Sequence, residues 1–137
     1  MIVLDTCVVS EPLRARPEPR VLDWLAHQRD ASITSVTVGE LLGGVRMLPR
    51  GRRRTDLLAA IEAALEARAG RILAYDAAAA RIFAELRESA REAGRALTVE
   101  DGMIAAICRQ HGVPIATRNV RDFEGLGVEL VDPWAGK

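Results

Sequence analysis

The sequence predicts an α/β domain in three layers, with helices on both faces of a mostly parallel sheet. Short aliphatic segments alternate with longer segments of helical periodicity along the 137 residues, a pattern typical of parallel strands joined by helices. No internal repeat, low-complexity tract or linker interrupts the alternation, so one domain over residues 1–137 is expected. Hydrophobic residues make up 49% of the chain, enough to build a core of this kind.

Five short aliphatic runs are predicted to be strands. The first, Ile2-Val3-Leu4, has no polar residue, and such a run is typical of a strand that is buried on both faces, as in a parallel sheet. The remaining predicted strands are residues 31–36, 71–75, 113–117 and 128–131.

Helices are predicted between these strands. Val38, Leu41, Leu42 and Val45 recur at the i, i+3, i+4, i+7 spacing of an amphipathic helix. Three further helical segments are each followed by a glycine, which can end a helix. These segments are residues 55–68 before Gly70, residues 77–93 before Gly94, and residues 99–111 before Gly112. Three prolines between residues 11 and 20 indicate a short helix and a loop, and an apolar helical face follows from Val21.

Composition bounds the classes of protein to be considered. Basic and acidic residues number 19 each, so net charge does not favour a nucleic-acid partner, and only local charge can. No apolar stretch approaches the length of a membrane span, and the N-terminus has no basic, signal-like region. Cys7 and Cys108 form neither a disulfide framework nor a spaced metal motif. We therefore expect a cytoplasmic protein with no membrane partner.

Four acidic residues are predicted to meet at one edge of the sheet. Asp5 follows the first strand, Glu40 lies near the start of the helix after the second, Asp101 lies in the first turn of a later helix, and Asp122 follows the strand 113–117. Strand C-termini and helix N-termini lie together at the ligand-binding edge of such folds. Crowded carboxylates repel one another, and a hard divalent cation removes that penalty. The pattern therefore predicts a site for Mg2+ or Mn2+.

These acidic residues also have structural interpretations. An Asp directly after a strand is often a helix N-cap or a turn residue, and this is the structural alternative for Asp5. Glu100 and Asp101 can each stabilise the first turn of a helix, and helical periodicity does not choose between them.

Two further features are open to either a functional or a structural explanation. Gly43 and Gly44 share the side of the helix that carries Glu40, and two glycines there indicate either close helix packing or the approach of a ligand. The arginine-rich run at residues 50–54 is the best candidate for contact with a phosphate backbone, and its structural alternative is a solvated loop at a helix start.

Other chemistries of α/β proteins do not fit the spacing. A haloacid-dehalogenase-like phosphatase needs a second Asp two residues after the first, where this chain has Cys7. The nearest arginine to that thiol, Arg14, is too far along the chain for a cysteine phosphatase loop. No G-x-G-x-x-G or G-x-x-x-x-G-K motif follows a strand. His27 is expected on an exposed helix side and His111 at a helix C-terminus, so neither is a candidate catalytic residue.

Four segments, taken together, resemble the PIN domain, and more narrowly the VapC/FitB type of toxin ribonuclease. They are LDTCVVSEPLR at the start, TVGELLGGV around Glu40, EDGMIAAICRQHG around Asp101, and ATRNVRDFEGLGVELVDPW at the C-terminal end. The resemblance spans nearly the whole chain and implies a PIN-like α/β/α fold. It places the family's acidic residues at Asp5, Glu40 and Asp101, and so selects Asp101 over Glu100.

The family's fourth acidic position falls at either Asn119 or Asp122, and only Asp122 is acidic. Asp122 is therefore the fourth candidate catalytic residue, with Asn119 as a neutral helper. The candidate substrate-binding residues are Arg118, Asn119 and Thr6. The family usually carries Asn where this chain has Cys7, and a thiol orients a ligand less well than an amide. The alternative for Cys7 is a small buried hydrophobic residue.

The resemblance implies hydrolysis of RNA phosphodiester bonds, with Asp5, Glu40 and Asp101 as ligands of Mg2+, or of Mn2+. It also implies the toxin of a type II toxin–antitoxin system. Such a toxin is a homodimer that binds a small VapB/FitA-like antitoxin, whose C-terminal segment covers the acidic cleft. The alternative is a catalytically weak PIN domain that mainly binds an antitoxin. The carboxylate set favours the enzyme, because a binding module has no need of it.

Overall fold

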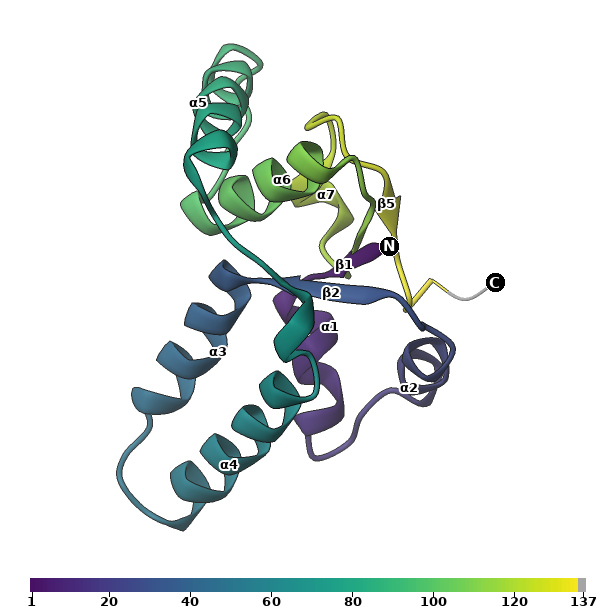
Figure 1. The fold of residues 1–137 in the computed structure, drawn as a ribbon, viewed down its shortest axis with the longest axis vertical. Helices are drawn as coiled ribbons and strands as arrows, with labels where there is room; N and C mark the ends of the chain where they lie inside the picture. Colours follow the sequence, from purple (N-terminus) through teal and green to yellow (C-terminus); the bar gives the residue numbers. More distant parts are fainter. Residues whose placement is uncertain (136–137) are drawn as a thin grey trace.

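A five-stranded parallel sheet lies between two layers of helices in the computed structural model, which describes residues 1–135 (Figure 1). Residues 136 and 137 of the predicted domain lie outside this range. The strands are β1 (Ile2–Leu4), β2 (Ala31–Thr34), β3 (Ile72–Leu73), β4 (Ile115–Ala116) and β5 (Leu130–Val131). Their order is β3-β2-β1-β4-β5, and each neighbouring pair is parallel. The predicted three-layer α/β fold is confirmed.

Helices occupy most of the chain between the strands. They are α1 (Thr6–Ser10), α2 (Pro19–Ala26), α3 (Ser35–Arg46), α4 (Arg52–Glu66), α5 (Ala77–Glu92), α6 (Val99–His111) and α7 (Val120–Phe123). Single 3-10 turns lie at Glu11–Leu13 and Ala69–Arg71. Figure 1 shows α5, α6 and α7 on one side of the sheet and α1, α3 and α4 on the other. Within residues 1–135, no helix combines the length and the apolar character needed to cross a membrane.

Alternate residues of the central strands face the two helical layers. Val3 and Ile115 pack into one core with residues of α5 and α6. Leu4 and Ala116 pack into the other core with residues of α1, α3 and α4. All four are fully buried. Because both faces of the sheet are covered, β1 and β4 are apolar throughout rather than alternating.

Capping side chains set the boundaries that the sequence pattern misplaced. The predicted strand 31–36 ends at Thr34, because the Thr34 hydroxyl accepts a hydrogen bond from the Thr37 amide and starts α3. Asp5 likewise caps α1 directly after β1. The sequence did not predict α1 or α7, since each is too short to show helical periodicity. Helix α4 begins at Arg52, three residues before the predicted start and inside the arginine-rich run, whose structural alternative was a solvated loop with a helix start.

Two glycines fix the ends of α6. Gly112 has a φ of 65° and ends the helix in the left-handed conformation that favours glycine, as its position predicted. Near the other end, a Cβ atom at Gly102 would lie 2.5 Å from Phe83 Cε1, so the glycine permits the close approach of α5. This packing holds the first turn of α6, which carries Asp101.

Candidate active site

The candidate site lies at the C-terminal ends of β1 and β4, in the middle of the sheet. Strand β1 pairs with β2 on one side and with β4 on the other, so the chain winds in opposite directions from this point. Open parallel sheets bind ligands where the winding reverses, because the loops that follow the neighbouring strands diverge there. Asp5 follows β1 and Thr117 follows β4 at this edge.

Asp5 is a buried carboxylate held by hydrogen bonds from three neighbours. Its Oδ1 accepts from the Thr6 amide at 2.8 Å, and its Oδ2 accepts from the Thr117 hydroxyl at 2.7 Å and from the Cys7 thiol at 3.6 Å. The residue is only 5% exposed. Asp5 is therefore both the N-cap of α1 and a charged group at the sheet edge, so the structural and functional interpretations of this residue hold together.

Glu40 is joined to the start of α1 through Thr6. Thr6 Oγ1 donates to Glu40 Oε1 at 2.5 Å and lies 3.1 Å from Thr37 Oγ1. A hydroxyl has one proton and can donate only one hydrogen bond. Because the Thr6 hydroxyl donates to Glu40, Thr37 is the donor in the contact between the two threonines. Thr37 is fully buried, and the three side chains form a directed chain from the core to the site. Thr6, predicted to bind substrate, contacts Glu40 in this structure.

Asp101 is half-buried in the first turn of α6, and its environment disfavours the charged form. The pKa of its carboxyl is raised from 3.8 to about 6. Burial is the largest cause, and the charges of Asp5, Asp122 and Glu40 raise the pKa further. The charges of Asp5, Glu40 and Asp122 therefore all reach Asp101 at this edge, whereas Glu100 is exposed.

The chemistry of this set suits a hard divalent cation. All its donors are carboxylate oxygens, and none of the ion pairs within residues 1–135 involves them. Across the described part of the chain, however, no three His, Cys, Asp or Glu side chains lie close enough to hold one ion together. Asp5, Glu40 and Asp101 therefore do not form a three-ligand cluster in this structure, and their assignment as metal ligands stays a prediction. The set fits Mg2+, which keeps several waters and takes few direct protein ligands.

Cys7 lies at the site and also packs against the core. Its Sγ donates to Asp5 Oδ2 and lies 3.8 Å from Thr117 Oγ1. Burial, followed by the charge of Asp5, raises the pKa of the thiol to about 11, so Cys7 is neutral at pH 7. The side chain also packs with the residues between the sheet and α3. Both interpretations of Cys7 thus describe part of its environment.

Three exposed candidates follow β4. The Asn119 amide donates to Thr117 Oγ1 at 3.0 Å, and none of the described hydrogen bonds involves the Asn119 side chain. Asp122 lies in the first turn of α7. The Arg118 guanidinium carbon lies 5.4 Å from the centroid of the Trp134 ring. Backbone geometry therefore keeps all three at the sheet edge, and both Asn119 and Asp122 remain candidates for the fourth position.

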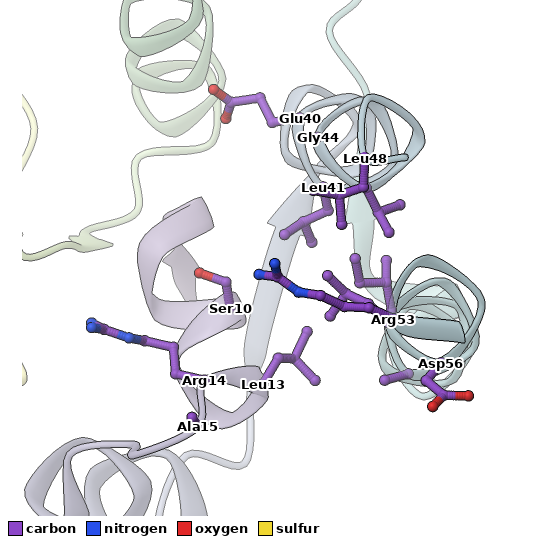
Figure 2. Close-up of a pocket in the computed structure, with 14 residues that line it drawn as sticks. Ser10, Leu13, Arg14, Ala15, Glu40, Leu41, Gly44, Leu48, Arg53 and Asp56 are labelled. Atoms are coloured by element: carbon purple, nitrogen blue, oxygen red, sulfur yellow. The ribbon is translucent and has the colours of Figure 1, made fainter. Parts of the chain in front are cut away.

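A groove of about 840 Å³ leads away from Glu40 between α1, α3 and α4 (Figure 2). Its walls are mainly aliphatic, with contributions from Leu13, Leu41, Val45, Leu48, Leu57 and Ile61. Figure 2 shows Arg53 extending into the groove from α4, and Asp56 at the opposite end from Glu40. One member of the arginine-rich run thus faces this groove rather than the sheet edge.

The glycines of α3 are not explained by packing within the chain. A Cβ atom at Gly43 or Gly44 would meet no atom within 4 Å, and Gly44 lines the groove. The helix-packing interpretation of these glycines therefore fails for this chain alone, and the approach of a ligand or partner is the alternative that stands.

Residues 2–128 match the family model described as the PIN domain. The chain belongs to the PIN-domain family. It is 39% identical over 137 residues to the VapC ribonuclease Y4jK of Sinorhizobium fredii, and the match covers 98% of each chain. The crystal structure of FitAcB from Neisseria gonorrhoeae has 39% sequence identity and a TM-score of 0.92, over 98% of this chain and 99% of that one. VapBC-5 from Mycobacterium tuberculosis, a member of the VapBC family of toxin-antitoxin systems, has 31% identity and a TM-score of 0.69, over 95% and 96%.

Sequence reasoning missed two threonines of this PIN domain. Thr117 donates to Asp5, and Thr37 donates to Thr6. Both are fully buried polar residues. A signal was present for each, because Thr117 is a polar residue at the end of an aliphatic run, and Thr37 lies one helical turn before Glu40. The family resemblance stated from the sequence is confirmed.

Proposed function

We propose that this PIN domain is a divalent-metal-dependent ribonuclease and the toxin of a type II toxin–antitoxin system. The observation that carries the proposal is the group of carboxylates beside Asp101, whose charges add to burial in raising the pKa of Asp101. A structural role does not need such repulsion, whereas a bound cation removes it. The name of the relative from Sinorhizobium fredii, a VapC ribonuclease, supports the same activity.

Asp5, Glu40 and Asp101 are the proposed ligands of Mg2+ or Mn2+, with Asp122 as the fourth catalytic carboxylate. When bound, the cation activates water and offsets charge on the attacked phosphate. The chain's own hydroxyls orient the ligands, since Thr117 donates to Asp5 and Thr6 donates to Glu40.

The RNA is proposed to be held by the exposed residues after β4. Arg118 carries a positive charge at the edge that holds the carboxylates, where it can contact a phosphate. The Asn119 side chain adds an amide donor and acceptor beside Asp122. Thr6 is proposed to contact substrate only with the oxygen lone pair that its bonds to Glu40 and Thr37 leave free.

The proposed partner is a small VapB/FitA-like antitoxin, because VapBC-5 belongs to a toxin–antitoxin system. The aliphatic groove that begins at Glu40 fits an apolar segment of such a protein. An arginine at the end of this segment can bind the carboxylates with two parallel hydrogen bonds and displace the cation. A homodimer in the cytoplasm is proposed as the working form, as in the sequence prediction.

Cleavage of RNA by the purified protein over a series of Mg2+ and Mn2+ concentrations tests this proposal. Asp5→Asn and Asp101→Asn should abolish cleavage while circular dichroism shows a folded chain. Glu100→Gln is the matched control, because Glu100 is the exposed neighbour of Asp101 on the same turn. Cleavage that persists undiminished in excess EDTA contradicts the mechanism.

A catalytically weak binding module is the second candidate, and Cys7 is the observation that favours it. The family's usual amide is replaced by a thiol that contacts Asp5. If this candidate holds, the parent protein binds its antitoxin tightly but shows no more cleavage than Asp101→Asn.

A further inference from the structure

We propose that a pocket beside the carboxylate edge binds one unstacked nucleotide of a single-stranded RNA. This inference rests on the proposed function and names a subsite for its substrate. The pocket has a volume of about 340 Å³, within the range of small-ligand sites. Its walls come from the loop after α1 and from the C-terminal segment, and they include Arg14, Arg16, Arg118 and Trp134. We call it the Trp134 pocket.

The Trp134 pocket is next to the carboxylates along the chain and in space. Arg118, which lines it, directly follows Thr117, and the Thr117 hydroxyl donates to Asp5 Oδ2 at 2.7 Å. A strand of RNA whose phosphate lies at the carboxylates therefore passes the pocket with a neighbouring nucleotide. The pocket is separate from the aliphatic groove, to which it is joined only through Arg14.

Trp134 and Arg118 form a stacking surface for a base. The guanidinium carbon of Arg118 lies 5.4 Å from the Trp134 ring centroid. Aromatic rings and guanidinium planes are the surfaces on which unstacked RNA bases are held. The backbone of Trp134 is held by two hydrogen bonds, since its carbonyl accepts from Arg20 Nη1 at 3.0 Å and its amide donates to Asp132 Oδ1 at 2.9 Å. The ring is held in turn by packing against the core beside α1 and β1. A fixed ring loses little freedom when a base stacks on it.

The charge of the pocket suits a phosphate. Arg14 is paired with the buried Glu11 at 3.5 Å, and Glu18 accepts from a backbone amide at the start of α2. Arg16 and Arg118 form no ion pair with any residue from 1 to 135. Two cations are thus free beside a stacking surface, although the chain as a whole has no net charge. This combination of base stacking and phosphate contact is typical of single-stranded RNA sites.

Tryptophan fluorescence gives a direct test. The chain has 2 tryptophans, so Trp24→Phe leaves Trp134 as the only tryptophan, which is excited selectively over Tyr75 at long wavelength. A short single-stranded oligoribonucleotide is titrated into this full-length variant in EDTA, which prevents metal-dependent cleavage. We expect saturable quenching of Trp134 emission. An abasic ribose-phosphate chain of equal length and charge is the matched probe, and it should bind more weakly and leave the emission unchanged.

Binding variants separate stacking from charge. With a labelled oligoribonucleotide, Trp134→Leu should weaken binding roughly tenfold, and Trp134→Phe should recover most of it. Arg118→Gln should lower the slope of log affinity against log salt by about one. Thermal unfolding of each variant shows whether the fold is retained, and Trp134→Phe keeps the test valid if Trp134→Leu unfolds.

Several results overturn the proposal. They are an absence of quenching, equal binding of the abasic probe, or parental affinity in folded Trp134→Leu. Equal quenching by a poly-glutamate peptide assigns the pocket to an acidic protein segment instead. Because the binding assay contains no metal, a protein that fails to cleave RNA can still pass it. An active ribonuclease can equally fail it, so the two proposals are tested separately.

Discussion

The Thr6 hydroxyl donates a 2.5 Å hydrogen bond to Glu40, a residue 34 positions further along the chain. The amide of the same Thr6 donates to Asp5 at 2.8 Å. One residue therefore sets the positions of two proposed metal ligands, which come from different elements. The direction of its hydroxyl is fixed in turn by Thr37, which is buried and donates to Thr6 Oγ1. Thr6 is thus best described as a positioning residue for the carboxylates.

Thr6→Val should lower the cleavage rate roughly ten- to hundredfold, because a hydrogen bond to a charged group contributes about 1.5–3 kcal/mol. The volume of the side chain is nearly kept, and the amide bond to Asp5 is retained. Thr6→Ser restores the hydroxyl and should recover most of the rate. The measurement is cleavage over a Mg2+ series, in which Thr6→Val should also need more Mg2+ for half-maximal rate. Loss of rate with an unchanged Mg2+ requirement would argue against a role in positioning Glu40.

Asp101 predicts a dependence of stability on pH in metal-free protein. Its pKa is raised from 3.8 to about 6 in the folded state. Between these values the folded chain keeps a proton that the unfolded chain has lost, so the free energy of unfolding falls as pH rises through this interval. Asp101→Asn should remove the dependence and raise the stability at pH 7. The gain should be about 1 kcal/mol, less than the full shift, because the side chain is only half-buried and solvent screens it.

Urea unfolding in EDTA at pH 4 and pH 7 measures this effect of Asp101. Glu100→Gln is the control and should keep the parental dependence on pH. Equal stabilities of the parent and Asp101→Asn at pH 7 would mean that burial and the neighbouring carboxylates together do not disfavour the charged form of Asp101.

Cys7→Asn restores the amide that the family usually carries and should give Mg2+-dependent cleavage equal to or better than that of the parent. The thiol contacts Asp5 at 3.6 Å, so it lies beside a proposed metal ligand. A thiophilic ion such as Zn2+ should therefore inhibit the parent more than the Asn variant. Both proteins are assayed over a Zn2+ series at fixed Mg2+. Identical inhibition curves would make Cys7 a packing residue only.

Gly44→Ala should stabilise the isolated protein by about 0.5–1 kcal/mol, because glycine in a helix interior is unfavourable. The new methyl group has open space, since a Cβ atom at Gly44 meets nothing within 4 Å. Gly102→Ala is the comparison variant and should destabilise the chain. A Cβ atom at this position would lie 2.5 Å from Phe83 Cε1. Urea unfolding of both variants and the parent measures these differences in the free energy of unfolding. A destabilised Gly44→Ala would show that the α3 glycines are needed by the chain itself.

Hydrophobic periodicity was sufficient for the architecture but not for the contacts inside the site. The aliphatic runs and the i, i+3, i+4, i+7 pattern placed Asp5, Glu40 and Asp101 at one edge, and the family resemblance chose Asp101 over Glu100. The short helix α1 was not predicted, because it has only five residues and its start depends on a single capping carboxylate, that of Asp5. The hydrogen bond from Thr117 to Asp5 was not predicted, because it joins residues 112 positions apart that only the folded chain brings together.

The distance along the chain between Asp5 and Thr117 has a consequence during synthesis. Asp5 is synthesised before its hydroxyl donor, which lies 112 residues later in the chain. Strand β1 also cannot pair with its second neighbour in the sheet until β4 has been synthesised. A nascent chain that is released before Thr117 therefore carries Asp5 without its hydroxyl donor and β1 without its second neighbouring strand. Only a chain that extends beyond Thr117 thus carries the assembled site.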